Sequence, residues 1–266
     1  MVARGLLQCR WQYLQGKARH VPQQKQAKKQ RVDLLLVERG LAESREKAQA
    51  LLMAGRVTRD GRPVTKPGQQ VDSGCRLAVS APMPYVGRGG FKLAHALEEF
   101  ALDVAGAVAL DVGASTGGFT DCLLQRGATR VYALDVGYGQ LDQRLRQDPR
   151  VAVMEHVNAR YPFQLPEQVD VATVDVAFIS LKLVLPSVAE HLKPGGRIVA
   201  LVKPQFEAER KQIGKAGVIK DPKVHAEVLA KIIVWAVEQG YRLQGLTTSP
   251  IVGDAGNREF LLLLQV

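Results

Sequence analysis

Cysteine is scarce in this chain, and long apolar runs are missing from it. The three cysteines, Cys9, Cys75 and Cys122, have neither the spacing of metal ligands nor that of a disulfide framework, a usage typical of a reducing compartment. No apolar run reaches the roughly 18 residues that a membrane-spanning helix needs. The first residues also lack the apolar core and cleavage site of a secretory signal. We therefore expect a cytoplasmic protein with no membrane segment and no metal site.

Acidic residues are absent from residues 1–32, whereas basic residues are frequent there. Glutamine and lysine dominate residues 23–30, which predicts a disordered basic arm over residues 1–30. Serine is also absent from this arm, which argues against a transit peptide. The whole chain has a formal net charge of +10, and such a charge favours polyanions, above all nucleic acid. A basic protein without a nucleic-acid partner is the alternative.

Residues 31–80 have the pattern of a small α+β domain. A short apolar stretch from Val32 ends at Gly40, and Ser44 is placed to cap a second helix that runs to Gly55. Short β runs follow, separated by turns at 60–61 and at 66–68. A proline-containing linker over residues 81–87 then leads to a region of different pattern.

From residue 88 to residue 266, apolar strand patterns alternate with helical patterns. This alternation predicts an α/β fold, a doubly wound Rossmann-like domain with a mostly parallel sheet and helices on both faces. Two strand patterns at the end of the chain are joined by a short turn, which predicts an antiparallel terminal strand. We expect strands at 108–112, 131–135, 151–154, 169–175, 197–203, 241–248 and 258–265, and helices at 91–100, 119–126, 181–191 and 223–238.

A glycine-rich turn follows the first of these strands. Gly113, Gly117 and Gly118 lie in this turn, and the next strand ends at Asp135. Glycines let the backbone approach a ligand at the start of a helix, and an acid in this position can bind ribose hydroxyls. The spacing is not that of the dinucleotide fingerprint. A nucleoside cofactor site is predicted, and a tight turn in another doubly wound enzyme is the alternative.

Four charged residues border the strands where ligands bind in such sheets. Asp175 and Lys203 follow strands, Glu259 precedes the last strand, and Lys92 lies on the helix before the first strand. Two cations and two anions in one crevice predict a catalytic site. Taken singly, each has an ordinary alternative: the solvated face of a helix for Lys92, a strand end for Lys203, or a turn cap for Asp175.

The small domain resembles the alpha-L RNA-binding fold of the ribosomal small-subunit protein four type. The resemblance is carried by the sequence of residues 31–48, by Gly-Arg-Val-Thr-Arg-Asp-Gly-Arg-Pro-Val at 55–64 and by Lys-Pro-Gly at 66–68. It implies docking on folded RNA through Arg31, Arg45, Arg56 and Lys66. From the residues alone, these cations are candidates for phosphate contacts, and a solvated charged surface is the alternative.

The large domain resembles the FtsJ-type ribose 2′-O-methyltransferases in its set Lys92, Asp175, Lys203 and Glu259, and the TlyA (hemolysin-A) family in particular. The family resemblance is carried by the motifs at 87–93, 111–120, 135–141, 178–181, 202–207 and 256–260. It implies S-adenosylmethionine as cofactor, ribosomal RNA or ribosomal subunits as partner, and methylation of a cytidine 2′-hydroxyl. Lys203 is then the proton acceptor or a positioning group, Lys92 and Glu259 orient it and the hydroxyl, and Asp175 positions Lys203.

The same resemblance implies the residues that contact the cofactor. Asp135 would bind the ribose, Phe178 would lie against the adenine, and Asn158 stands where related enzymes often have an acid for the adenine amino group. The segment 83–86 departs from the Arg-Ala-Trp-Val of some family members. The amino-acid end of the cofactor would contact Gly113, Ala114, Thr116, Gly117 and Gly118.

Two other functions remain open at this point. One is an RNA-binding ribosome-assembly factor that binds the cofactor and methylates incidentally, and the less favoured one is a membrane-active hemolysin. Only Gln265 and Val266 follow the last strand pattern, whereas longer family members have a helical tail there and are associated with both ribosomal subunits. We therefore expect methylation of the large subunit.

Overall fold

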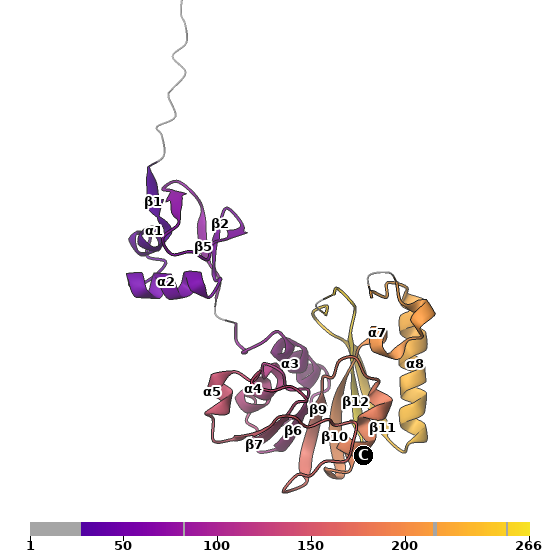
Figure 1. The fold of residues 1–266 in the computed structure, drawn as a ribbon. Helices are drawn as coiled ribbons and strands as arrows, with labels where there is room; N and C mark the ends of the chain where they lie inside the picture. Colours follow the sequence, from indigo (N-terminus) through magenta and orange to yellow (C-terminus); the bar gives the residue numbers. More distant parts are fainter. Residues whose placement is uncertain (1–27, 82, 215–216, 254) are drawn as a thin grey trace, which may run out of the picture. The chain divides into compact units, whose positions relative to one another are not determined.

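A computed structural model describes residues 28–81, 83–214, 217–253 and 255–266. The chain separates into two compact units, one ending at residue 82 and the other spanning residues 83–266 (Figure 1). Residues 1–27 of the expected basic arm (residues 1–30) lie outside the described part of the chain. Lys29 and Gln30, which that expectation includes, belong to the first strand of the small unit.

The small unit packs two helices against short strands. Helix α1 (Val32–Glu38) is followed by α2 (Arg45–Met53), whose first turn is capped by the Ser44 hydroxyl accepting from the Lys47 N–H. Strand β1 (Lys29–Arg31) pairs with β4 (Gln70–Asp72), and β2 (Val57–Arg59) lies between β3 (Arg62–Pro63) and β5 (Leu77–Val79). The core of this unit is made of buried aliphatic residues, including Leu35, Leu36, Leu52, Val57 and Val71.

The large unit is built on a seven-stranded sheet with the order β11-β12-β10-β9-β6-β7-β8. Five of its strands run parallel to one another: β6 (Val108–Val112), β7 (Arg130–Leu134), β8 (Val151–Met154), β9 (Val169–Val174) and β10 (Leu192–Val202). Strand β12 (Phe260–Gln265) pairs antiparallel with both β10 and β11 (Arg242–Thr248). The predicted fold class is confirmed, because a mostly parallel sheet carries an antiparallel terminal strand.

Both faces of this sheet are covered. Along β6, Ala109 packs into one apolar cluster while Leu110 and Val112 pack into another, as the two-residue period of a strand requires. Helices α3 (Gly89–Glu99) and α4 (Gly118–Gln125) lie on the first face. The second face is covered by α6 (Leu185–Ala189) and the long α8 (Pro222–Glu238) (Figure 1).

One predicted helix is interrupted. The expected helix at 181–191 is a 3₁₀ turn, η1 (Leu181–Leu183), followed by the short α6, because Pro186 fits only the first turn of a new helix. Strand β10 also begins earlier than expected, with a register shift between Leu192 and Arg197. The remaining short helices are α5 (Gln143–Arg146), α7 (Pro204–Glu207) and η2 (Arg210–Gln212).

Candidate functional site

The glycine-rich turn joins β6 to α4 at the carboxyl edge of the sheet. Gly113 and Gly117 both have positive φ, 84° and 97°, a backbone conformation that side chains rarely tolerate. A Cβ on Gly113 would overlap the Asp175 carbonyl, and one on Gly118 would lie 2.9 Å from the Gly90 nitrogen. The glycines therefore let the turn pack against β9 and α3, which brings the turn and Asp175 together.

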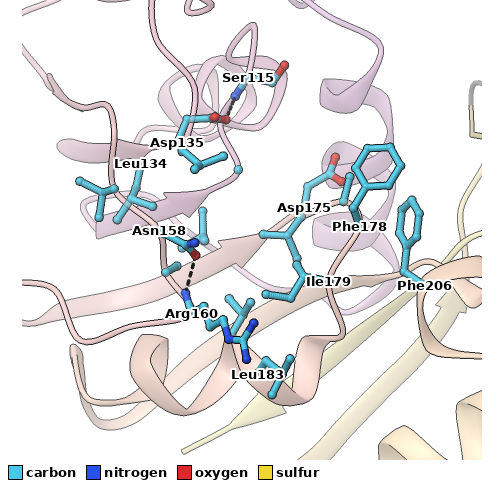
Figure 2. Close-up of a pocket in the computed structure, with 18 of the residues that line it drawn as sticks. Ser115, Leu134, Asp135, Asn158, Arg160, Asp175, Phe178, Ile179, Leu183 and Phe206 are labelled. Atoms are coloured by element: carbon cyan, nitrogen blue, oxygen red, sulfur yellow. Dashed lines mark hydrogen bonds between the residues drawn. The ribbon is translucent and has the colours of Figure 1, made fainter.

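A cavity of about 760 Å³ opens at this edge, over the ends of β6, β7 and β9 (Figure 2). Asp135 lines it with both carboxylate oxygens held by backbone donors: Oδ2 accepts from the Ser115 N–H at 2.8 Å and Oδ1 from the Gly137 N–H at 2.7 Å. Each oxygen keeps further acceptor capacity. The carboxylate is thus fixed in one orientation and can still bind a pair of hydroxyls.

Asn158 and Phe178 line the same cavity from two other elements. The Asn158 Oδ1 atom accepts from the Arg160 N–H at 3.0 Å, so the amide NH₂ group is the freer end of this side chain. Phe178 has a positive φ of 62° and is 90% exposed. The centroid of its ring lies 5.0 Å from that of the Phe206 ring, and both side chains are drawn in Figure 2. Such backbone strain in an exposed aromatic residue is a feature of binding sites rather than of cores.

A second cavity, of about 470 Å³, adjoins the first and shares Gly113, Ser115, Asp175 and Ala177 with it. The four charged residues expected to meet in a crevice all line it. The Lys203 ammonium lies 2.6 Å from Asp175 Oδ1, and the Lys92 ammonium lies 2.6 Å from Glu259 Oε2. The structure therefore brings Lys92, Asp175, Lys203 and Glu259 together as two ion pairs.

The two ion pairs differ in burial. The side chains of Lys92 and Glu259 are 11% and 3% exposed, and they form a direct hydrogen bond between α3 and the start of β12. Lys203 and Asp175 retain 13% and 19% side-chain exposure, and the buried Asp175 Oδ1 has no hydrogen bond of good geometry among the described residues. The Lys203–Asp175 pair is thus the more accessible one, and the Lys92–Glu259 pair is better suited to a supporting role.

The predicted cofactor residues divide between the two cavities. Gly113 lines both, whereas Ala114, Thr116 and Gly118 line the smaller one. Gly117 is in neither set of lining residues, and a Cβ there would overlap the Leu145 side chain. Its role in the structure is to let α4 pack against α5.

Sequence reasoning gave no role to two carboxylates near the site, the buried Asp111 and the half-buried Glu207. Asp111, fully buried, accepts hydrogen bonds from Thr120 at 2.6 Å and Thr173 at 2.8 Å, and burial raises its pKa to about 6. Glu207 accepts from the Ser180 hydroxyl at 2.6 Å and the Leu181 N–H at 2.7 Å, and burial raises its pKa as well. Asp111 joins β6, β9 and α4, and Glu207 joins α7 to η1. Thr120 and Thr173 alone gave no signal in the sequence, because threonine is common in strands and first turns.

In the small unit, the predicted RNA-binding cations have different surroundings. Arg31 and Arg45 both contact the buried Asp33, at 2.8 and 3.2 Å, and hydrogen bonding from Arg31 is the main reason that the pKa of Asp33 is strongly lowered. Arg56 donates twice to the Ser80 carbonyl. Lys66 is exposed, and Gly68 of the same turn lies against the Arg31 guanidinium. Arg31, Arg45 and Lys66 therefore share one region of the unit.

Among residues 28–81, 83–214, 217–253 and 255–266, no group of three or more histidine, cysteine, aspartate or glutamate side chains could hold a metal ion. In the same part of the chain, no helix has the length and apolarity required to cross a bilayer.

Comparison with known proteins identifies the family. The model of the FtsJ-like methyltransferases matches residues 85–266, and that of the S4 domain matches residues 30–76. "Putative rRNA methyltransferase YqxC" of Bacillus subtilis is 52% identical over 90% of this chain and 86% of its own length. The Mycobacterium tuberculosis "16S/23S rRNA (cytidine-2'-O)-methyltransferase TlyA" is 46% identical over 90% of this chain and 91% of its own.

A solved structure agrees with these relatives. "Putative hemolysin from Streptococcus thermophilus" is 46% identical, covers 90% of this chain and 89% of its own, and superposes with a TM-score of 0.69. The chain belongs to the FtsJ-like methyltransferases, within the TlyA family, and carries an S4 domain at its N-terminal end.

Proposed function

We propose that this chain transfers the methyl group of S-adenosylmethionine to the 2′-hydroxyl of a cytidine in ribosomal RNA. The observation that carries the proposal is the meeting of two ion pairs, Lys203–Asp175 and Lys92–Glu259, in a small cavity beside a larger one. The name of the M. tuberculosis relative supports the choice of ribose and base.

The larger cavity fits the nucleoside part of such a cofactor. The Asp135 carboxylate would accept from both ribose hydroxyls, since its orientation is held by two backbone N–H groups. Phe178 would lie against the adenine, and Asn158 would bind the adenine edge, either by donating from its NH₂ group to a ring nitrogen or by accepting from the amino group with the second lone pair of Oδ1. The amino-acid end of the cofactor would lie in the adjoining smaller cavity, whose lining includes Gly113, Ala114, Thr116 and Gly118.

The smaller cavity would hold the target ribose. Bound S-adenosylmethionine supplies an electrophilic methyl group. Lys203 would accept the 2′-hydroxyl proton as the oxygen attacks only if its side chain is the neutral amine; as the ammonium that pairs with Asp175, it would donate to the hydroxyl oxygen and hold it in line. Asp175 orients the Lys203 side chain at 2.6 Å, and the Lys92–Glu259 pair lines the same cavity. The reaction leaves a methylated ribose oxygen and S-adenosylhomocysteine.

Methylation of a base is supported less well. Cytosine carbon-five methylation requires a cysteine nucleophile, but Cys122 is fully buried in α4, and burial raises its pKa to about 12. A thiol so far from ionisation is a poor nucleophile. The segment Asp175 to Phe178 also lacks the Asp/Asn-Pro-Pro-aromatic pattern that is usual for adenine amino methylation.

Recognition of RNA would begin at the small unit. Arg31, Arg45 and Lys66 lie in one region of it and would contact phosphates. Lys66 is the most accessible of the four candidates, because Arg31 and Arg45 are paired with Asp33 and the Arg56 guanidinium binds the Ser80 carbonyl. We further propose the large ribosomal subunit as the preferred substrate. The name of the M. tuberculosis relative includes the RNA of both subunits, so methylation of both is the alternative.

The test is transfer of a labelled methyl group to ribosomal RNA, followed by mapping of the modified nucleotides. We expect a methyl at a cytidine 2′-oxygen, and its absence with the Lys203→Ala variant. Label on a base would contradict the ribose assignment. Tight binding of RNA and cofactor with no methylation of any ribosomal particle would instead support the ribosome-assembly factor.

A further inference from the structure

We propose that a groove beside the smaller cavity binds the base of the nucleotide next to the methylated one. The groove has a volume of about 350 Å³, and its lining includes Tyr85, Phe91, His95, Glu98, Arg126 and Ile251. The inference rests on the proposed function, since it adds a second RNA subsite to the same enzyme.

The position of the groove is the first argument. Ile251 lines both the groove and the smaller cavity, so the two adjoin at this side chain. Helix α3 contributes Lys92 to the cavity and, one turn away, His95 to the groove, a rise of roughly 4.5 Å. RNA is a polymer, and a ribose held at Lys92 must have neighbours on the adjoining surface. The groove lies where such a neighbour would be.

The lining of the groove is the second argument. Phe91 is 36% exposed on a helix whose other large apolar residues, Leu93 and Leu97, are buried. Its ring lies 5.6 Å from that of Tyr85, edge to face at 87°. Aromatic faces of this kind bind nucleobases by stacking, with little dependence on sequence.

The charges of the groove favour a base over a phosphate. Arg126 and Glu98 are its ionised residues, and they form an ion pair with each other, so the groove carries no net positive charge. His95 adds a polar group: its Nε2 atom lies 3.3 Å from the Thr247 hydroxyl, and its Nδ1 atom has no hydrogen bond among the described residues. That nitrogen is available to the edge of a base.

The decisive variant is Phe91→Leu, which keeps an apolar side chain but removes the aromatic face. We expect kcat/KM for ribosomal RNA to fall by about 5- to 100-fold, the scale of one lost stacking contact, mainly through KM. His95→Ala should give a smaller loss, and Phe91→Tyr should restore activity. Glu99→Ala, an exposed position on the same helix, is the matched control and should behave as the parent protein does.

Two measurements separate this role from a structural one: the affinity for S-adenosylhomocysteine and the melting temperature. Both should be unchanged in Phe91→Leu. Equal kcat/KM in the parent, Phe91→Leu and His95→Ala would overturn the groove while leaving the methylation intact. A parallel loss of S-adenosylhomocysteine binding would also overturn it, because the ring would then act through the cofactor site. If the parent protein fails to methylate RNA at all, the proposed function fails instead.

Discussion

The Lys203 ammonium contacts the Asp175 carboxylate at 2.6 Å, although the two residues follow different strands, β10 and β9. The same two strands carry a second such pair at their other ends, Lys193–Asp170, also at 2.6 Å but about half exposed. Strands β9 and β10 therefore carry two lysine–aspartate ion pairs, a candidate catalytic pair at one end and an exposed pair at the other.

Lys203→Ala should lower methyl-transfer turnover by roughly 10²–10⁴-fold, the scale of a proton-transfer group. Affinity for S-adenosylhomocysteine should change little, because the Asp135 and Phe178 side of the larger cavity is untouched. Lys193→Ala is the control and should leave turnover unchanged. Single-turnover kinetics and calorimetry measure the two quantities, and near-normal turnover in Lys203→Ala would refute its role.

Gly117→Val should destabilise the protein and weaken cofactor binding together. The new side chain would meet Leu145 and Leu141 and would sit at a φ of 97°, with strain of about 1–3 kcal/mol from the backbone alone. Gly106→Ala is the control: its φ is also positive, but no atom lies near its Cβ. The loss of stability in this variant therefore measures the cost of the backbone conformation alone. Thermal melting with and without S-adenosylhomocysteine checks this, and normal stability with lost binding would point to a direct clash with the cofactor.

Asp111 should make stability depend on pH. Burial raises its folded-state pKa to about 6 from 3.8, so the folded protein binds this proton more tightly than the unfolded chain does. The contribution of this proton to the free energy of unfolding, roughly 3 kcal/mol, is therefore fully present below about pH 4 and is lost as the pH rises through about 6. The free energy of unfolding, measured with urea, should differ less between pH 5 and pH 7.5 for Asp111→Asn than for the parent protein. Identical differences would contradict this.

Lys66→Gln should weaken RNA binding and reduce the slope of log K against log salt by about 0.9 if it loses one phosphate contact. Arg45→Gln should do the same and also destabilise the small unit, because Arg45 contacts the buried Asp33. Lys47→Gln, at an exposed Lys47–Glu43 pair, is a control of equal charge change. An unchanged salt slope for both Lys66→Gln and Arg45→Gln would exclude this region as the RNA dock.

Separated ribosomal subunits test the substrate. Incubation with labelled cofactor should give label on a cytidine of the large-subunit RNA and none on the small subunit. Label on both would match the naming of the M. tuberculosis relative and would overturn the preference while leaving the chemistry in place.

The sequence by itself determined the local features of this protein. Strand and helix periods predicted the α/β fold, since each period reflects only which face of an element is buried, and the sheet confirms it. The motifs around Gly113 and Asp135 indicated a nucleoside site because their spacing is set within a single strand-turn-helix-strand unit. The change of pattern after residue 80 likewise marked a small domain before a large one.

The tertiary structure alone decided which charges meet. Lys92 and Glu259 are 167 residues apart and form a hydrogen bond only because β12 inserts beside β10. Gly117, which stays a predicted cofactor contact, also makes room for Leu145, and Arg56, which stays a predicted RNA contact, donates to the Ser80 carbonyl. Spacing along a chain limits which residues can be near a ligand, but the packing of distant elements determines whether a side chain reaches that ligand or another part of the protein.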